Sequence, residues 1–160
     1  MNLPSLPHIN VVGSMLTGTH GSGHKYQILT NNVTEFDIVF PDGTLKTLNS
    51  ATTPHFWNYL FNFGGLGVIT SMSMVLVPKF MVNKSVYQDL YWDTLFKKDV
   101  FDTVMHRQDF LSFFTDWKER KMNSVWVGKK YMPNETPPAY EQDYFGAPHI
   151  NSDRIHPCPG

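Results

Sequence analysis

The chain has 160 residues, of which 41% are hydrophobic and 14% aromatic, which excludes a disordered chain and provides for a packed core. Its formal net charge of −1 does not indicate a nucleic-acid partner or an anionic membrane surface. The single cysteine, Cys158, excludes a disulfide framework and favours an intracellular setting, and no apolar run is long enough for a transmembrane segment.

The first third of the chain predicts an extended segment, a glycine-rich loop and a β-hairpin. Residues 1–9 carry two prolines in an apolar setting, which is typical of extended backbone. Residues 33–49 predict the hairpin, because Phe36 and Ile38 alternate with polar residues ahead of a Pro-Asp-Gly turn. One face of the hairpin is therefore expected to join a core.

A helix and a strand are predicted next. Residues 52–65 predict a helix, with Thr53 as the N-cap, Pro54 at the first helical position and a Gly-Gly stop. The expected apolar face of this helix comprises Phe56, Tyr59, Leu60 and Phe63. Residues 68–80 alternate as a strand, whose expected inner face comprises Val68, Thr70, Met72, Met74 and Leu76.

The second half of the chain predicts three strands and one helix. The strands are expected at residues 81–92, 110–117 and 124–131, and the helix at residues 97–108 with Asp99 as its cap. From Met132 onward the chain is proline-rich and shows no periodicity. We therefore expect an α+β fold with mostly antiparallel strands and a break near residues 78–82.

The stretch LTGTHGSGHK, residues 16–25, suggests two sites that its details disfavour. Gly18 and Gly23 have the spacing of a triphosphate-binding loop, but His24 replaces its lysine, and the following residues do not predict the helix that such a loop opens. His20 and His24 have the spacing of a helical metal site, but two glycines lie between them and no third ligand is evident.

A third interpretation of the same stretch is a backbone cradle for a ligand. Gly18, Gly21 and Gly23 allow positive φ and a close approach, and neighbouring hydroxyl groups add hydrogen-bond donors. A tight solvent-exposed loop explains the same composition. The residues alone leave these two interpretations open.

Two further segments carry candidates with a simpler structural explanation. The glycines of residues 63–70 precede a predicted strand, which a helix stop and close backbone packing explain. Asp116 lies among the aromatic residues of segment 114–117 and offers a carboxylate. A structural role is the more common one for such an aspartate.

Together, five stretches resemble the FAD-dependent oxidases with a vanillyl-alcohol-oxidase-type (PCMH-type) FAD-binding domain. They are LPSLPHINVVGSMLTGTHGSG, FPDGTLKTLN, FGGLGVIT, FTDW with VWVGKK, and HPCPG, in the order of that family and over nearly the whole chain. The resemblance is greatest to the alditol (sugar-alcohol) oxidases, with gulonolactone and D-arabinono-1,4-lactone oxidases as relatives.

The resemblance implies a set of residues that contact FAD. They are Ser5, Asn10, Gly13, Thr17, Gly18, Thr19, His20, Gly21 and Val68. Asn10 stands where the family often has serine, and Ser5 also matches a serine that orients the substrate hydroxyl. No metal ligand and no catalytic base is implied within this chain.

The resemblance also implies the domains and the activity. Residues 1–80 are expected to be the C-terminal part of the FAD-binding domain, and residues 81–160 the beginning of a substrate-binding domain. The implied reaction is hydride transfer from a sugar alcohol or an aldonolactone to FAD, with O2 as the acceptor that yields hydrogen peroxide. The resemblance leaves peripheral membrane association open.

Compared with this family, the chain is expected to be a central fragment. The subdomain that binds the FAD pyrophosphate would precede residue 1, and the proton-accepting residues would follow Gly160. We expect the isolated chain to be inactive and to hold FAD weakly, with the N-terminal FAD subdomain as a partner. The alternatives are a non-catalytic flavin- or nucleotide-binding module and a half that complements a separate chain.

Overall fold

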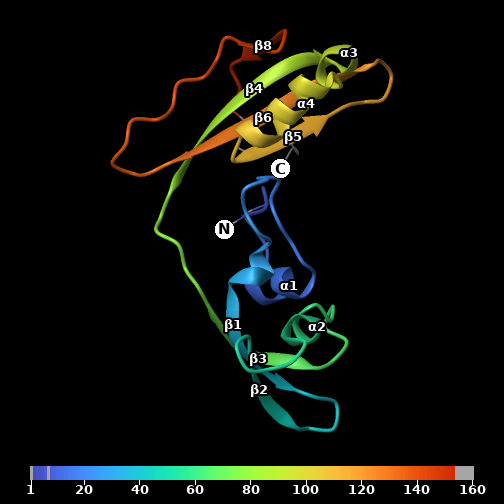
Figure 1. The fold of residues 1–160 in the computed structure, drawn as a ribbon, viewed down its shortest axis with the longest axis vertical. Coiled ribbons are helices and arrows are strands. Elements are labelled where there is room, and N and C mark those ends of the chain that lie inside the picture. The colour runs from blue at the N-terminus through green and yellow to red at the C-terminus, as the bar shows by residue number, and fades with distance from the viewer. Residues whose placement is uncertain (1, 7, 154–160) are drawn as a thin grey trace. The chain divides into compact units, whose positions relative to one another are not determined.

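The structure, a computed structural model, describes residues 2–6 and 8–153 and divides into two compact units (Figure 1). Unit 1 consists of Met1–Gly21 and Tyr26–Val77, and unit 2 of Ser22–Lys25 and Pro78–Gly160. Both units contain helices and antiparallel strands, as expected for the α+β class. The assignment of a FAD-binding and a substrate-binding domain stays a prediction, and Cys158 with the HPCPG stretch lies outside the described residues.

Unit 1 is built on a three-stranded antiparallel sheet in the order β2-β1-β3. Its elements are α1 (Val11–Leu16), the 3-10 helix η1 (Leu29–Asn32), β1 (Val33–Val39), β2 (Leu45–Asn49), α2 (Phe56–Leu60) and β3 (Val68–Met74). The buried core side chains are Met15, Leu29, Val33, Phe36, Ile38, Leu48, Phe56 and Leu60. Because they come from α1, η1 and α2 and from the sheet, one core joins these elements.

The predicted hairpin is present as β1 and β2. Gly43 has a φ of +83° in its turn, a conformation that favours glycine. On β1, Asp37 accepts hydrogen bonds from the hydroxyls of Thr47 on β2 and Ser71 on β3, both at 2.6 Å. The hydrogen bond from Ser71, and to a smaller extent the one from Thr47, holds the pKa of Asp37 below its ordinary value. Through these two bonds the carboxylate links all three strands.

The expected inner face of the third strand is wrong in part, because β3 contains a β-bulge. On β3, Ser71 and Ile69 pair with successive residues of β1, which leaves Thr70 as an extra residue. An extra residue reverses the alternation of inward and outward side chains. The side chains that pack on the core are therefore Ile69, Met72 and Met74, whereas Val68, Thr70 and Leu76 are exposed.

The predicted helix at residues 52–65 is shorter in the structure, and its predicted cap is wrong. His55 is the N-cap of α2, with a φ of +56° and no side-chain cap bond. The Thr53 hydroxyl instead accepts a hydrogen bond from a backbone N–H group at the end of β2 at 3.0 Å. The Asn62 side chain donates to the Tyr59 carbonyl and accepts from the Gly64 N–H group. These bonds end the helical region, and Phe63 is 78% exposed.

Unit 2 is built on a five-stranded sheet in the order β5-β6-β4-β8-β7. Its elements are β4 (Met81–Tyr91), α3 (Trp92–Leu95), α4 (Lys98–Arg107), β5 (Phe110–Phe114), β6 (Lys121–Tyr131), β7 (Asp143–Tyr144) and β8 (Ala147–Ile150). Its buried core side chains are Tyr87, Leu90, Leu95, Val104, Leu111, Val125, Val127, Tyr144 and Ala147. Figure 1 shows α4 running along the β5–β6 part of the sheet, where Val104 joins this core.

The three strands and the helix predicted for the second half are confirmed as β4, β5, β6 and α4. Asp99 does not cap α4: Lys97 is the N-cap, without a side-chain bond, and Asp99 lies in the first turn. A carboxylate in the first turn still favours the helix, because it faces the positive end of the helix dipole.

Several short elements were not predicted. Helices α1, η1 and α3 have at most six residues, too few to develop a clear periodicity. Strands β7 and β8 lie in the proline-rich segment that was expected to be irregular, and Gly146, with a φ of +88°, is in the turn between them. Among the described residues, no helix has the length and apolar character needed to cross a bilayer.

Candidate functional site

Helix α1 and the loop after it hold most of the predicted site residues. Asn10 is the N-cap of α1, and its side-chain oxygen accepts a hydrogen bond from the Gly13 N–H group at 3.0 Å. Thr17 follows the helix, and its hydroxyl donates to the Gly13 carbonyl at 3.0 Å. The Thr17 hydroxyl also lies 3.0 Å from the Thr19 hydroxyl. These four residues are therefore neighbours around one short helix.

The loop at residues 17–21 uses several of its own N–H groups. Those of Gly18 and Thr19 donate to carbonyl groups of α1 at 3.4 and 2.9 Å, and that of Gly21 donates to the Asn2 carbonyl at 2.9 Å. His20 Nδ1 donates to the Gly21 carbonyl at 2.7 Å. An anion cradle needs free N–H groups. These three are already engaged, so the polar groups left for a ligand are mainly side-chain hydroxyls and the imidazole.

Two glycines of this loop have a packing role. Gly18 has a φ of +65°, and a Cβ atom there would lie 2.7 Å from Cε1 of Phe61. A Cβ atom on Gly21 would lie 2.2 Å from the Leu3 carbonyl oxygen, closer than van der Waals contact allows. The absence of side chains at these positions therefore lets α2 and the N-terminal segment pack against the loop.

The remaining predicted residues connect to the same region of unit 1. Ser5 is exposed and lies in the N-terminal segment, which contacts the loop through the hydrogen bond from the Gly21 N–H group to the Asn2 carbonyl. The second glycine-rich stretch meets the end of α1, where the Phe63 N–H group donates to the Leu16 carbonyl at 3.4 Å. Val68 starts β3 directly after that stretch and is 67% exposed. The structure thus gathers the loop residues closely and ties the segment of Ser5 to Gly21, whereas Val68 follows a stretch that meets the end of α1.

The structure shows what surrounds the two other interpretations of the loop. The element after the loop is the short 3-10 helix η1 and not the α-helix that a triphosphate-binding loop opens. His20 belongs to unit 1, whereas His24 belongs to unit 2 and packs edge-on against His106 at 4.1 Å between ring centroids. Within the described part of the chain, no three histidine, cysteine or acidic side chains are grouped as metal ligands.

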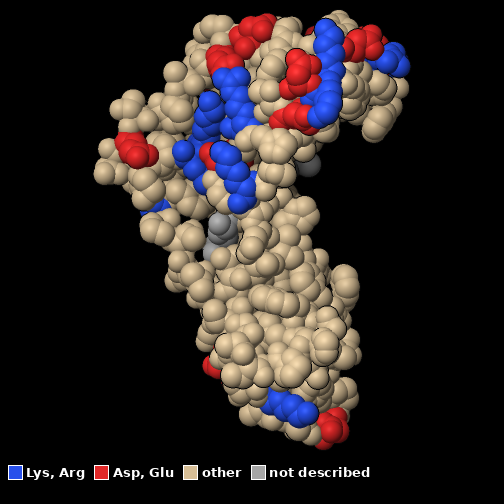
Figure 2. Space-filling view, viewed as in Figure 1, with Lys and Arg blue, Asp and Glu red and all other residues tan. Residues whose placement is uncertain are grey.

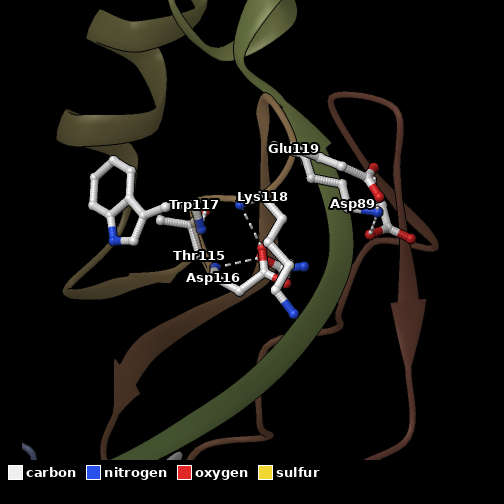
Figure 3. A network of polar contacts seen from close by, with 8 residues as sticks. Asp89, Thr115, Asp116, Trp117, Lys118 and Glu119 are labelled. Atoms are coloured by element: carbon white, nitrogen blue, oxygen red, sulfur yellow. Dashed lines mark hydrogen bonds and ion pairs between the residues drawn. The ribbon is translucent and has the colours of Figure 1, made fainter.

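The FTDW segment forms a tight turn in unit 2 (Figure 3). The Asp116 carboxylate accepts a hydrogen bond from the Lys118 N–H group at 3.1 Å, and the Asp116 N–H group donates to the Asn123 side chain at 2.9 Å. The indole of Trp117 points away from this turn and is 78% exposed. The structural role expected for Asp116 is therefore confirmed.

Charge is unevenly distributed along the chain. The Lys, Arg, Asp and Glu side chains of unit 1 are Glu35, Asp37, Asp42 and Lys46, all in the β1–β2 hairpin. The face of unit 1 seen in Figure 2 is correspondingly neutral outside the hairpin. Helix α1 and the loop at residues 17–21 therefore have no lysine or arginine of their own to pair with a phosphate, and His20 is the one imidazole there.

Curated proteins resemble this chain over most of its length. An alditol oxidase of Streptomyces sp. is 33% identical over 99% of this chain and 35% of that protein. The D-arabinono-1,4-lactone oxidase of Debaryomyces hansenii is 28% identical over 99% of this chain and 29% of its own length. The L-gulonolactone oxidase of Mus musculus is 26% identical over 70% of this chain and 25% of its own length.

The chain is a relative of the alditol and aldonolactone oxidases. It spans about a third of the length of the Streptomyces protein, and less of the other two. No family model matches it.

The structure allows one expected departure from the family pattern to be interpreted. Asn10, at a position where the resemblance implies serine in many of these oxidases, caps α1. Serine and asparagine are nearly equivalent N-caps, because either side-chain oxygen accepts a hydrogen bond from the first turn. The exchange therefore preserves the helix that leads into the loop.

One polar feature of unit 2 was not anticipated. A crevice lies beside β4, and its lining includes Tyr87, Gln108 and Tyr144. Gln108 lies between α4 and β5, so no strand or helix periodicity singles it out, and Tyr144 lies in the segment expected to be irregular. These residues are far apart in the sequence, and only the fold of unit 2 brings them together.

Proposed function

We propose that the chain is the central part of an FAD-dependent oxidase of sugar alcohols or aldonolactones. Unit 1 would be part of the flavin domain, and unit 2 the beginning of the substrate domain. The observation that carries the proposal is the similarity to an alditol oxidase over 99% of the chain, which includes the whole loop at residues 17–21.

The residues of unit 1 suit the ring system of a flavin better than its phosphates. The ring system is uncharged, with apolar faces and polar edges. Thr17, His20 and Ser5 would bond to its edges, and Val68 would offer an apolar contact. The lysine of unit 1, Lys46, lies in the hairpin, and three loop N–H groups are engaged. We therefore expect the pyrophosphate to be held by other residues.

The chemistry follows from the group that the site would hold. A bound flavin would accept a hydride from the carbon that bears the substrate hydroxyl. O2 would then reoxidise the flavin and be reduced to hydrogen peroxide. Ser5 would orient the reacting hydroxyl by a hydrogen bond. The loop residues would hold the flavin edge in place, and the hydroxyl proton would pass to a base supplied elsewhere in the enzyme.

The surface of unit 1 suits burial against the rest of such an enzyme. The large hydrophobic side chains exposed on it outside the sheet include Leu3, Leu6, Ile9, Val11, Trp57 and Phe63. An apolar surface that carries no formal charge is costly to leave in water and is typical of an interface. We propose that the N-terminal FAD subdomain is the partner, so the isolated chain would hold FAD weakly and would not turn over.

A chimera tests the proposal. In it, this chain replaces the matched third of the Streptomyces alditol oxidase. We expect a monodisperse protein that retains flavin through gel filtration and whose flavin is bleached anaerobically by a sugar alcohol or an aldonolactone. Thr17→Val should lower the flavin content, because it removes a hydroxyl of the loop. Thr52→Val, which removes an exposed hydroxyl of the same unit beyond the hairpin, is the matched control.

The outcomes separate the alternatives. A folded, monodisperse chimera without flavin would contradict the proposal. Flavin that is retained but not reduced by any substrate of either class would favour a non-catalytic binding module. Equal flavin content in the Thr17→Val and Thr52→Val proteins would show that the loop does not contribute as proposed.

A further inference from the structure

The proline-rich segment between β6 and β7 contains a short sequence motif. Residues 132–142 include Pro133, Pro137 and Pro138, and the stretch from Pro137 to Tyr140 has the sequence Pro-Pro-Ala-Tyr. Proline fixes φ at about −65° and has no N–H group, so such a stretch favours the polyproline II conformation and cannot donate to a β-ladder. None of the residues proposed to hold FAD or substrate lies in this segment.

The motif is displayed at the surface of unit 2. Residues 136–140 lie between β6 and β7 and belong to neither strand, and Figure 1 shows the segment running beside β4 as a plain ribbon. Pro137 and Ala139 are exposed, and Tyr140 is 49% exposed. A partner can therefore reach the first proline and the tyrosine ring without opening the core of this unit.

Contacts with β4 and β8 hold the motif in place. The Pro138 carbonyl accepts a hydrogen bond from the Asn83 side chain on β4 at 2.5 Å. The ring of Tyr140 stacks on the imidazole of His149 on β8, with 4.1 Å between the ring centroids and 15° between the ring planes. Both contacts are made by single side chains of the sheet, so a partner that offers better contacts can replace them without unpairing a strand.

The chemistry of the motif selects one class of partner. Adjacent prolines present apolar rings on a preformed backbone, which suit a groove lined by aromatic side chains, and a tyrosine two residues later adds a further ring. Pro-Pro-x-Tyr is the form of such a ligand that WW domains bind. SH3 domains bind PxxP ligands, whose prolines stand three positions apart, and the prolines of residues 132–142 lack that spacing.

We propose that residues 137–140 are a docking site for a WW domain. The two prolines would lie in the aromatic groove of the domain, and the Tyr140 ring would leave His149 and enter a pocket beside that groove. Residues 132–142 contain Glu135 and Glu141 and no lysine or arginine, so a basic rim on the domain would add to the attraction. The site does not depend on the flavin proposal, because all its residues belong to unit 2.

An NMR titration of the labelled full chain tests this site. The probe is an isolated WW domain that binds Pro-Pro-x-Tyr peptides, and an SH3 domain that binds PxxP peptides is the control. We expect saturable shifts of the backbone amides of Ala139, Tyr140 and Glu141 with the WW domain only. Absence of saturable shifts, saturable shifts confined to other segments, or equal shifts with the SH3 domain would overturn the proposal.

Matched variants locate the binding. Pro137→Ala and Tyr140→Ala should each weaken WW-domain binding roughly tenfold, because each removes an apolar anchor. Pro133→Ala changes an exposed proline of the same segment outside the motif, and Tyr91→Ala changes an exposed tyrosine of β4. Both controls should bind like the parent chain. Equal affinity in the motif variants and the controls would overturn the proposal.

The variant His149→Ala tests the exchange of contacts at Tyr140. It should bind the WW domain roughly two- to tenfold more tightly than the parent chain, because the Tyr140 ring no longer has to leave a stacked partner. A tyrosine with a purely structural role would not produce tighter binding. An unchanged or lower affinity of the folded His149→Ala protein would overturn the proposal. If Tyr140→Ala does not fold, the location of the shifts in the parent chain decides the question.

Discussion

Gly21 has no room for a side chain, and this makes it the most sensitive position of the loop. A Cβ atom there would lie 2.2 Å from a backbone oxygen, which cannot move aside without displacing the N-terminal segment. At Gly13 the nearest atoms to such a Cβ lie at 3.8 Å, and the residue is inside α1. The two glycines of one predicted site therefore have different physical roles.

We predict that Gly21→Ala and Gly13→Ala change stability in opposite directions. Gly21→Ala should lower the free energy of unfolding by about 1–3 kcal/mol, the range of overpacking, because the N-terminal segment must move. Gly13→Ala should raise it by about 0.5–1 kcal/mol, because alanine is the better helix former. Urea unfolding followed by circular dichroism measures both. A Gly21→Ala protein as stable as the parent would show that the segment is not held where the structure places it.

Tyr144 links the stability of unit 2 to pH. Burial raises the pKa of its phenol above the ordinary value of about 10, so the folded protein keeps a proton that the unfolded chain loses. The associated stability is present below about pH 10 and is lost as the pH rises toward the folded-state pKa.

We predict that Tyr144→Phe makes the loss of stability above about pH 10 less steep. At neutral pH the same change should cost about 1–2 kcal/mol, because Gln108 loses its hydroxyl partner. Unfolding in urea at a series of pH values measures both effects. Identical slopes above pH 10 in the two proteins would show that the phenol is not buried as described.

At the scale of the elements, prediction from sequence succeeded where a local pattern decides the structure. The hairpin was predicted because its alternation and its turn lie within a few residues of one another. The inner face of β3 was not, because the bulge at Thr70 appears only when the strand pairs with β1. The end of α2 was missed for a similar reason, since the bonds of Asn62 compete with a helix that the apolar spacing favours.

The sheet of unit 1 carries its own pH dependence through Asp37. Because the pKa of Asp37 is lower in the folded protein than in the unfolded chain, the carboxylate contributes stability above the unfolded pKa of about 4. This stability is lost as the pH falls through the folded-state pKa.

We predict that Ser71→Ala raises the pKa of Asp37, because the hydrogen bond from the Ser71 hydroxyl is the largest cause of its lowering. The carboxyl carbon shift of Asp37, followed by NMR during an acid titration, measures it. An unchanged midpoint would contradict the hydrogen bond between β1 and β3.

At the scale of the whole molecule, the candidate site stays a prediction, and the structure adds how its residues are held. The glycine and threonine residues of the loop were assigned from the family resemblance. Their N–H groups could not be assigned from sequence, because two of their partners are carbonyls of α1, a helix that was not predicted, and the third is Asn2. The neutral character of unit 1 also emerges only when the charges are sorted by unit.

The most direct measurement is an NMR titration of the labelled chain with riboflavin and, separately, with ADP. Riboflavin carries the ring system without phosphates, and ADP carries the phosphates without the ring. The account predicts weak, saturable shifts with riboflavin at residues 10–21 and at Val68, and no saturable shifts there with ADP. Shifts of the same amides with ADP, or none with riboflavin, would contradict the claim that this neutral loop holds a flavin ring.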